Sequence, residues 1–338
     1  MKKLLVAMSG GVDSAVSVLL LREMGYEVAG GTMILQSCGE KEAEDARQSA
    51  RTLGIEFHTF DWQEQFRREV ITPFKQVYQA GATPNPCIFC NQALKFGLFL
   101  DKALELGYDG IATGHYARVR QENGRYLLYT ARDVTKDQTY MLYHLSQDRL
   151  SHVIFPMGDV TKEEARKKAE QAGLAVAGKH DSQDICFIPD GDYLAFLQKD
   201  GLVPQSGRFI GPEGEDLGAH KGQEAYTIGQ RRGLDVAYGS RIYVVGKEGN
   251  NVRLGFSEEL FSRRVKVGEV NFIPFDRLDA PIRAQAKLRY TPQTAPCTII
   301  PEEDGVILEF DQPQRAVTPG QSAVFYDGEL VLGGGIIK

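Results

Sequence analysis

Residues 1–14 read Met-Lys-Lys-Leu-Leu-Val-Ala-Met-Ser-Gly-Gly-Val-Asp-Ser, a short apolar run that ends directly in a glycine pair. Residues 4–8 predict a buried strand, and the apolar residues 15–21 predict a helix. Two adjacent glycines let the backbone turn tightly, so that several N–H groups point inward beside the positive N-terminus of that helix. The stretch therefore predicts a loop that cradles a phosphate.

The polar residues of this loop narrow the type of phosphate site. Ser9 and Ser14 offer hydroxyl donors, and Asp13 can hold a magnesium ion or a ribose. No Gly-Lys-Ser or Gly-Lys-Thr follows the glycines, which excludes the P-loop of kinase-type NTPases. The pattern Ser-Gly-Gly-x-Asp-Ser resembles the loop of the ATP-pyrophosphatase family, whose members cut ATP between the α and β phosphates and adenylylate a carbonyl oxygen. A glycine-rich turn in an ordinary α/β protein is the plainer alternative.

Strands and helices alternate after the loop. The pattern predicts strands at 27–33, 55–60 and 109–113, and helices at 41–53, 62–80 (interrupted at Pro73), 92–106, 161–172 and 192–198. This alternation predicts an α/β doubly wound parallel-sheet nucleotide-binding domain with ligands at the carboxyl ends of the strands. Met33 and Gly114 lie at such ends, although a methionine there is as often plain core.

The pattern changes past residue 201 to glycine turns and short alternating strands, such as 241–245 and 282–290. An earlier hairpin is predicted at 119–130. We expect three domains: 1–202 as the ATP-pyrophosphatase-type catalytic domain, 203–262 as a β-rich central domain, and 263–338 as a small C-terminal β-barrel that contacts RNA.

The chain carries five cysteines and no secretory signal, which favours reduced thiols in the cytoplasm. Cys87 and Cys90 form a C-x-x-C pair after Pro84-Asn85-Pro86, near a helix start that would lower a thiol pKa. Such a pair can be a redox pair, half of a zinc site, two ligands of an iron–sulfur cluster, or two buried structural cysteines. Cys186 taken alone would be a core residue, and we expect Cys38 and Cys297 to be dispensable.

Charge gives a mixed indication. The net charge of −6 argues mildly against a nucleic-acid partner. Residues 263–290 nevertheless hold seven basic against three acidic residues, a local charge of +4, and residues 220–234 form a loop that bears the pair Arg231-Arg232. No stretch reaches membrane length.

Together these motifs resemble the tRNA-specific 2-thiouridylase (MnmA/TrmU) family over essentially the whole chain. The resemblance implies an enzyme, a tRNA-uridine 2-sulfurtransferase, that replaces the 2-oxygen of the wobble uridine of tRNA by sulfur through an adenylylated intermediate. It implies ATP contacts at Ala7, Met8, Ser9, Gly10, Gly11, Val12, Asp13, Ser14, Met33 and Gly114. It implies a nucleophile at Cys90, in a Cys-Asn-x-x-x-Lys-Phe run, and a persulfide carrier at Cys186, in an Asp-Ser-x-x-Ile-Cys-Phe run. It implies tRNA contacts at Asn85, Pro86, Cys87, His115, Lys136, Asp137, Gln138, Arg289, Tyr290 and Gln321.

One position departs from the more familiar members, which carry aspartate where this chain has Cys87. Cys87, Cys90 and Cys186 would give a 4Fe-4S cube three protein ligands, as in related cluster-dependent tRNA thiolases, and zinc is the main competitor. The expected cofactors are ATP, Mg²⁺ and this cluster. The expected partners are tRNA with a wobble uridine and a sulfur donor, which is a cysteine desulfurase, a sulfur-relay protein or inorganic sulfide.

Two other functions remain open from the sequence. One is a small-molecule ligase or amidotransferase of the same ATP-pyrophosphatase fold, which would not need three thiols or a β-rich RNA platform. The other is an RNA-binding module that holds a structural metal through its cysteines, which the intact ATP loop disfavours.

Overall fold

The N-terminal part of the chain is built on a five-stranded parallel sheet. The computed structural model describes residues 2–36, 39–179, 185–188, 190–291 and 293–338. The sheet has the order β3-β2-β1-β4-β7, with every pair parallel. Its strands are β1 (Lys3–Ala7), β2 (Glu27–Ile34), β3 (Phe57–Asp61), β4 (Gly110–Thr113) and β7 (Val153–Ile154). Because the chain order reverses between β1 and β4, a ligand site is expected where these two strands end.

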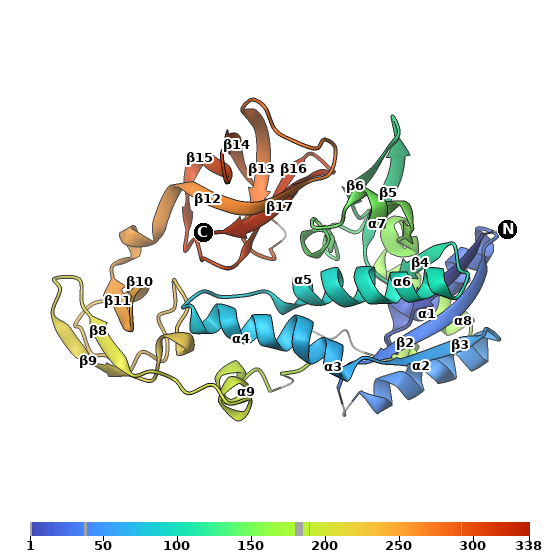
Figure 1. Cartoon of the computed structure of the whole chain (residues 1–338), viewed down its shortest axis with the longest axis horizontal. Helices are drawn as coiled ribbons and strands as arrows, with labels where there is room; N and C mark the ends of the chain where they lie inside the picture. Colours follow the sequence, from blue (N-terminus) through green and yellow to red (C-terminus); the bar gives the residue numbers. More distant parts are fainter. Residues whose placement is uncertain (1, 37–38, 180–184, 189, 292) are drawn as a thin grey trace.

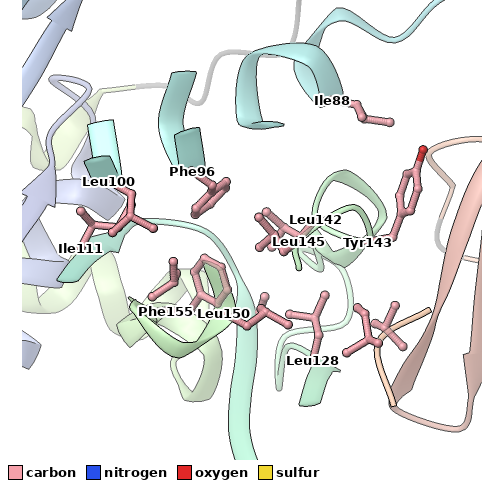
Figure 2. Packing of buried hydrophobic residues seen from close by; sticks show 14 of the residues in the cluster. Ile88, Phe96, Leu100, Ile111, Leu128, Leu142, Tyr143, Leu145, Leu150 and Phe155 are labelled. Atoms are coloured by element: carbon pink, nitrogen blue, oxygen red, sulfur yellow. The ribbon is translucent and has the colours of Figure 1, made fainter. Parts of the chain in front are cut away.

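Helices cover both faces of this sheet because successive residues of a strand point to opposite sides. Leu4 and Val6 of β1 share a core with residues of α1 (Val12–Glu23), α2 (Glu40–Leu53) and α8 (Lys162–Gln171). Leu5 belongs to a second core with Phe99 of α6 (Phe99–Glu105). In Figure 2 side chains of this second core converge from several elements, among them Phe96, Leu128 and Phe155.

Two long helical segments run from the sheet toward the rest of the molecule (Figure 1). The first consists of α3 (Gln63–Phe66), the π-helix η1 (Arg67–Ile71) and α4 (Thr72–Gln79), and the second of α5 (Pro86–Cys90), the π-helix η2 (Asn91–Leu98) and α6. The predicted interruption at Pro73 is wrong. Proline lacks an N–H and crowds the carbonyl four residues earlier, and here the wide π turn directly before it keeps the segment helical.

The second half of the chain is β-rich, as predicted. A four-stranded sheet of order β10-β11-β8-β9 comprises β8 (Gly207–Ile210), β9 (Asp216–His220), β10 (Tyr243–Glu248) and β11 (Asn251–Gly255). Six strands then close into a barrel through the β12–β17 pairing: β12 (Phe261–Phe272), β13 (Ile282–Lys287), β14 (Ala295–Glu302), β15 (Gly305–Arg315), β16 (Ser322–Asp327) and β17 (Leu330–Ile337). The predicted fold class is therefore confirmed, while the domain limits near residues 202 and 262 stay a prediction.

The hairpin of β5 (Ala117–Glu122) and β6 (Arg125–Thr130) forms as predicted, but it also extends the sheet of the barrel. Tyr129 pairs with Leu330 of β17, so the first domain and the barrel share one sheet. The other short helices are η3 (Thr139–Met141), α7 (Gln147–Ser151), η4 (Pro156–Asp159), η5 (Ala175–Gly178), α9 (Tyr193–Lys199), η6 (Gln223–Ala225) and η7 (Ser257–Leu260). None of the helices in the described ranges is long and apolar enough to cross a membrane.

Candidate active site

The predicted phosphate loop lies between β1 and α1. Gly10 has a φ of 70°, a conformation that favours glycine, and Gly11 is the N-cap residue of α1. Ser14 Oγ accepts a hydrogen bond from Ser9 N at 3.2 Å and donates one to Gly11 O at 3.0 Å. The loop is therefore held in shape by its own polar side chain.

Two glycines allow other elements to approach this loop. A Cβ on Gly10 would collide with the carbonyl oxygen of Glu42 in α2. A Cβ on Gly114 would lie 2.8 Å from Ser14 N, so the end of β4 contacts the loop. Gly114 thus lies where the sequence places it. Met33 is half-buried at the end of β2 and packs against two apolar clusters, which fits a core residue as well as an adenine contact.

The Asp13 carboxylate is engaged by two other side chains. Lys162 Nζ lies 2.8 Å from both carboxylate oxygens of Asp13, and the Tyr116 hydroxyl donates to Oδ1 at 2.9 Å. The side chain of Lys162 is only 11% exposed, against 29% for Asp13. Lys162 is a residue that the sequence reasoning missed. Its signal was the capping box of Thr161 and Glu164, which makes Lys162 the first residue of α8.

A second lysine touches the loop from the same region of the chain. Lys179 Nζ donates to Gly10 O at 3.0 Å and to Asp45 Oδ2 at 2.8 Å. A P-loop carries its lysine directly after its glycines. Here Lys162 and Lys179, more than 140 residues downstream in sequence, bring the positive charge to the loop.

The C-x-x-C pair occupies the first turn of the second long helical segment. Asn85 is the N-cap of α5, and its side-chain oxygen accepts from Cys87 N at 3.1 Å. Cys87 and Cys186 reach the surface, while Cys90 is half-buried. The interpretation of Cys186 as a core residue is wrong. Its neighbour Phe187 is the buried one, with ring centroids 5.5 Å from Phe66 and 5.3 Å from Phe74.

The three thiols share one electrostatic environment. Desolvation by the surrounding protein atoms raises the pKa of Cys87, of Cys90 and of Cys186, the last to about 12, even though Cys87 and Cys186 still reach the surface. The Lys95 ammonium opposes this rise in all three. The mutual repulsion of their negative charges also raises the pKa of Cys90 and Cys186. The expected lowering of thiol pKa by the helix start is therefore wrong, because desolvation outweighs it. Cys297 lies in the barrel core, and Cys38 falls outside the described residues.

The described part of the chain does not form a metal site as it stands. Among those residues, no group of three or more His, Cys, Asp or Glu side chains is arranged to hold a metal ion. Cys87, Cys90 and Cys186 are all described, so they do not fit a 4Fe-4S cluster in this arrangement. Asp13, the expected magnesium ligand, forms an ion pair with Lys162.

His115 lies between the end of β4 and the second long helical segment. It follows Gly114, its Nδ1 lies 2.7 Å from Thr113 Oγ1, and its ring packs 5.7 Å from that of Phe96. Burial, followed by the charges of Lys95 and His144, lowers the pKa of His115 well below its ordinary value. A neutral imidazole can hydrogen-bond a base, but it cannot pair with a phosphate through charge.

The other predicted tRNA contacts come from residues 85–87, from residues 136–138 and from the barrel. Gln321 Nε2 donates to Thr83 O at 3.0 Å and lies 3.4 Å from Pro84 O, so a barrel turn holds the approach to the cysteines. Tyr290 is 52% exposed, donates to Asp137 O at 3.2 Å, and feels the charge of Cys87. Pro86 is buried and Lys136 is half-buried. The side-chain oxygen Oε1 of Gln138 accepts a hydrogen bond from Tyr116 N at 3.0 Å. Arg289 donates hydrogen bonds to two backbone carbonyls of the barrel.

Asp137 and the basic residues of 263–290 are more engaged than the sequence suggests. The Asp137 carboxylate is buried and lies 3.5 Å from Lys287 Nζ at the junction with the barrel. Arg277 pairs with Asp279 and Arg283 with Asp311. Carboxylates therefore neutralise three of the seven basic residues that gave the local +4.

Comparison with known proteins identifies the family. The tRNA methyl transferase HUP domain matches residues 2–190, the tRNA methyl transferase PRC-barrel domain residues 195–255, and the aminomethyltransferase beta-barrel domain residues 262–337. The tRNA-specific 2-thiouridylase MnmA of Clostridium acetobutylicum is 45% identical to the chain, covering 100% of it and 99% of that protein. The corresponding MnmA of Halothermothrix orenii is 47% identical, again with 100% and 99% coverage. The chain belongs to the tRNA-specific 2-thiouridylase family.

One solved structure gives a weaker match than these 2-thiouridylase relatives. The U34-tRNA thiolase NcsA of Methanococcus maripaludis is 17% identical over 59% of this chain and 66% of that one, with a TM-score of 0.38. A likeness at that level says nothing about chemistry.

The shared cation makes a testable prediction about thiol reactivity. Lys95→Met should slow alkylation of Cys90 by iodoacetamide several-fold at pH 8, because loss of the ammonium raises the thiol pKa further and each unit costs about tenfold in thiolate. In the parent, alkylation should still rise with pH above 9. The rate is read by mass spectrometry of the Cys90 peptide. Lys102→Met, which removes an exposed lysine paired with Glu105, is the control, and an equal effect there would contradict the assignment.

Proposed function

We propose that this protein uses ATP to replace the 2-oxygen of the wobble uridine of tRNA with sulfur. One observation carries the proposal: a short series of contacts and one shared charge link the phosphate loop to the thiols. Gly114 contacts the loop, His115 packs on Phe96, and Lys95 acts on the thiols and on His115 alike. Nucleotide chemistry and sulfur chemistry therefore take place at one site. The full-length relatives that carry the name tRNA-specific 2-thiouridylase support this conclusion.

The first step activates an unreactive carbonyl. The 2-oxygen of uridine attacks the α phosphorus of ATP, an O–P bond forms, the bond to the β phosphate breaks, and pyrophosphate leaves. Negative charge grows on the departing phosphates. The backbone N–H groups of the loop would stabilise that charge, together with the ammonium groups of Lys162 and Lys179, which contact the loop at Asp13 and Gly10. Asp13 and Tyr116 hold Lys162 in place.

The second step brings sulfur to the same carbon. The terminal sulfur of a Cys186 persulfide attacks C2, and AMP leaves with the former 2-oxygen. The Cys90 thiolate then attacks the inner sulfur, which releases the thiocarbonyl and leaves a Cys90–Cys186 disulfide for an external reductant. Two features of the site support these roles: Cys186 is exposed and can be reloaded, while Cys90 lies half-buried beside Lys95.

A 4Fe-4S cluster on Cys87, Cys90 and Cys186 is the other route for sulfur. It would supply a sulfide on the iron that lacks a protein ligand. Among the described residues the three thiols are not grouped to hold a metal, so they would have to rearrange to ligate the cluster. About four irons per chain after anaerobic reconstitution, lost in Cys87→Ala, would favour the cluster. Full thiolation by metal-free protein would favour the persulfide.

The substrate side of the proposal rests on the residues around Cys87. A wobble base must leave its stack to reach a buried nucleophile. Tyr290, half exposed beside Cys87, can stack on the extruded base, and Gln321 fixes the loop that approaches it. We include in the proposal a magnesium ion with the nucleotide, a cytoplasmic location, and delivery of sulfur by a cysteine desulfurase, a sulfur-relay protein or inorganic sulfide.

The experiment that tests the function is pyrophosphate release. The parent protein with ATP should release pyrophosphate only when tRNA with uridine at the wobble position is present. The same tRNA with cytidine there should give background release. Release without tRNA, on addition of a small carboxylate, would support the ligase alternative instead. Methyl transfer, which two of the domain names mention, would show no pyrophosphate at all.

A further inference from the structure

The seam between the central domain and the barrel carries arginines that the proposed reaction does not use. Arg231, Arg232 and Arg241 are exposed on the central domain, and Arg289 and Arg315 are exposed on the barrel. In the ranges that the structure describes, none of the five is within ion-pair distance of a carboxylate. We call these five residues the arginine seam.

Direct contacts make the arginine seam continuous. Arg289 Nη2 donates to Arg315 O at 2.9 Å and to Ala316 O at 3.2 Å. The guanidinium of Arg315 lies over the ring of Tyr243 in β10 at 5.3 Å, and Gly229 approaches Ala316 so closely that a Cβ there would lie 2.7 Å from its Cβ. The Arg231-Arg232 pair follows Gly229 by two residues. The barrel and the central domain thus meet where both present unpaired arginines.

Other exposed arginines of the same two domains differ in this respect. Three of them face carboxylates, since Arg208 lies 2.8 Å from Asp216, Arg253 3.1 Å from Glu259, and Arg283 2.8 Å from Asp311. Arg263 and Arg264 of β12 are exposed and, among the described residues, have no carboxylate at ion-pair distance, as in the arginine seam. The chain as a whole has a net charge of −6. A cationic stretch left uncompensated on an acidic protein fits a polyanion.

The shape of the surface agrees with a nucleic acid. A hollow of about 470 Å³ is lined by Arg231 and Arg241, with Leu234, Val236 and Ile242 also in its wall. One carboxylate, that of Asp235, lies in the same wall and is paired with Lys221 at 3.9 Å. Guanidinium groups pair with phosphates in a forked geometry, and apolar walls accept a ribose or a base. The arginine seam also begins at Arg289, next to Tyr290, whose pKa is raised in part by the charge of Cys87.

We propose that the arginine seam binds the sugar–phosphate backbone of the tRNA and extends its contact from the barrel onto the central domain. The inference rests on the proposed function and adds Arg231, Arg232 and Arg241 to it. Backbone contacts of this kind hold and orient the tRNA without reading its sequence. The central domain would then provide a second tRNA-binding surface that helps to hold the wobble base at the cysteines.

The test is the salt dependence of tRNA binding to the full-length protein, measured by filter binding. Arg231→Gln, Arg232→Gln and Arg241→Gln combined should reduce the magnitude of the slope of log K against log salt by about two to three, because each lost phosphate contact removes about 0.7 to 0.9. Affinity at moderate ionic strength should fall by about tenfold to a hundredfold. The matched control combines Arg208→Gln, Arg253→Gln and Arg283→Gln, which removes the same charge from paired positions and should leave the slope nearly unchanged. Thermal unfolding confirms that both triple variants fold.

Three results would overturn the inference. An unchanged slope in the Arg231, Arg232 and Arg241 variant, with the parent still binding and thiolating tRNA, would leave the proposed function standing and remove the arginine seam from it. An equal loss of salt slope in the control variant would show that the effect comes from the net charge of the protein alone. A parent that shows no salt-dependent binding of tRNA would overturn this inference and the proposed function together.

Discussion

Lys162→Ala should lower the rate of tRNA-dependent pyrophosphate release by about a hundredfold to a thousandfold, the usual loss when one preorganised donor is removed from a developing anion. Lys162 is nearly buried and bonds both oxygens of Asp13. Its removal takes away a positive charge beside the phosphate loop and leaves Asp13 to repel the nucleotide. The measurement is a continuous pyrophosphate assay at saturating tRNA.

Two further variants make this prediction specific. Asp13→Ala should lose the same activity, because it releases the lysine that it orients, and both variants should keep the tRNA affinity of the parent. Lys167→Ala on the same helix removes an exposed lysine paired with Glu163 and should be silent. Parent-level release by Lys162→Ala would show that the ion pair with Asp13 serves the fold alone.

Cys90→Ala should abolish the formation of 2-thiouridine, by at least about a thousandfold, because a covalent step cannot proceed without its nucleophile. It should still release pyrophosphate in a tRNA-dependent manner within a few-fold of the parent, since the ATP step uses the loop and its lysines. The thiolated product is quantified by nucleoside analysis of the recovered tRNA, and pyrophosphate is followed in the same tubes.

Cys186→Ala should give the same separation of the two half-reactions, and Cys38→Ala should behave as the parent. Loss of pyrophosphate release in Cys90→Ala would mean that this thiol helps to bind the nucleotide or to seat the base. Full thiolation by Cys90→Ala would remove the helix start of α5 from the chemistry altogether.

Local patterns predicted those parts of the fold that local physics determines. The strand at 4–8, the loop and the following helix appear as β1 and α1, and the capping box at Thr161 gives α8 its start. The interruption predicted at Pro73 was wrong because the energetic cost of a proline within a helix depends on whether the preceding turn can widen. Here a π turn provides that wider turn. The attachment of the β5–β6 hairpin to the barrel could not be foreseen, because a strand edge does not reveal its partner.

The candidate site also has features that local sequence predicts and features that depend on tertiary structure. Motif spacing located the loop and the cysteines, yet it missed Lys162, whose role depends on an ion pair across 149 positions. It also assumed a helix dipole strong enough to favour thiolates, whereas burial around Cys87 and Cys90 outweighs that effect. The sequence implied that Asp137 contacts tRNA, whereas in the structure its buried carboxylate lies beside Lys287 of the barrel. Pairing and desolvation are tertiary properties, and sequence spacing does not contain them.

The most direct test of the central claim is nucleoside analysis of tRNA after reaction. Unmodified tRNA with a wobble uridine is incubated with the protein, ATP, a sulfide source and a reductant, then digested and analysed by mass spectrometry, with AMP measured in parallel. The account predicts 2-thiouridine at the wobble position alone, one AMP for each sulfur incorporated, and no product without ATP. Sulfur at another position, a methylated nucleoside, or thiolation that proceeds without ATP would contradict it.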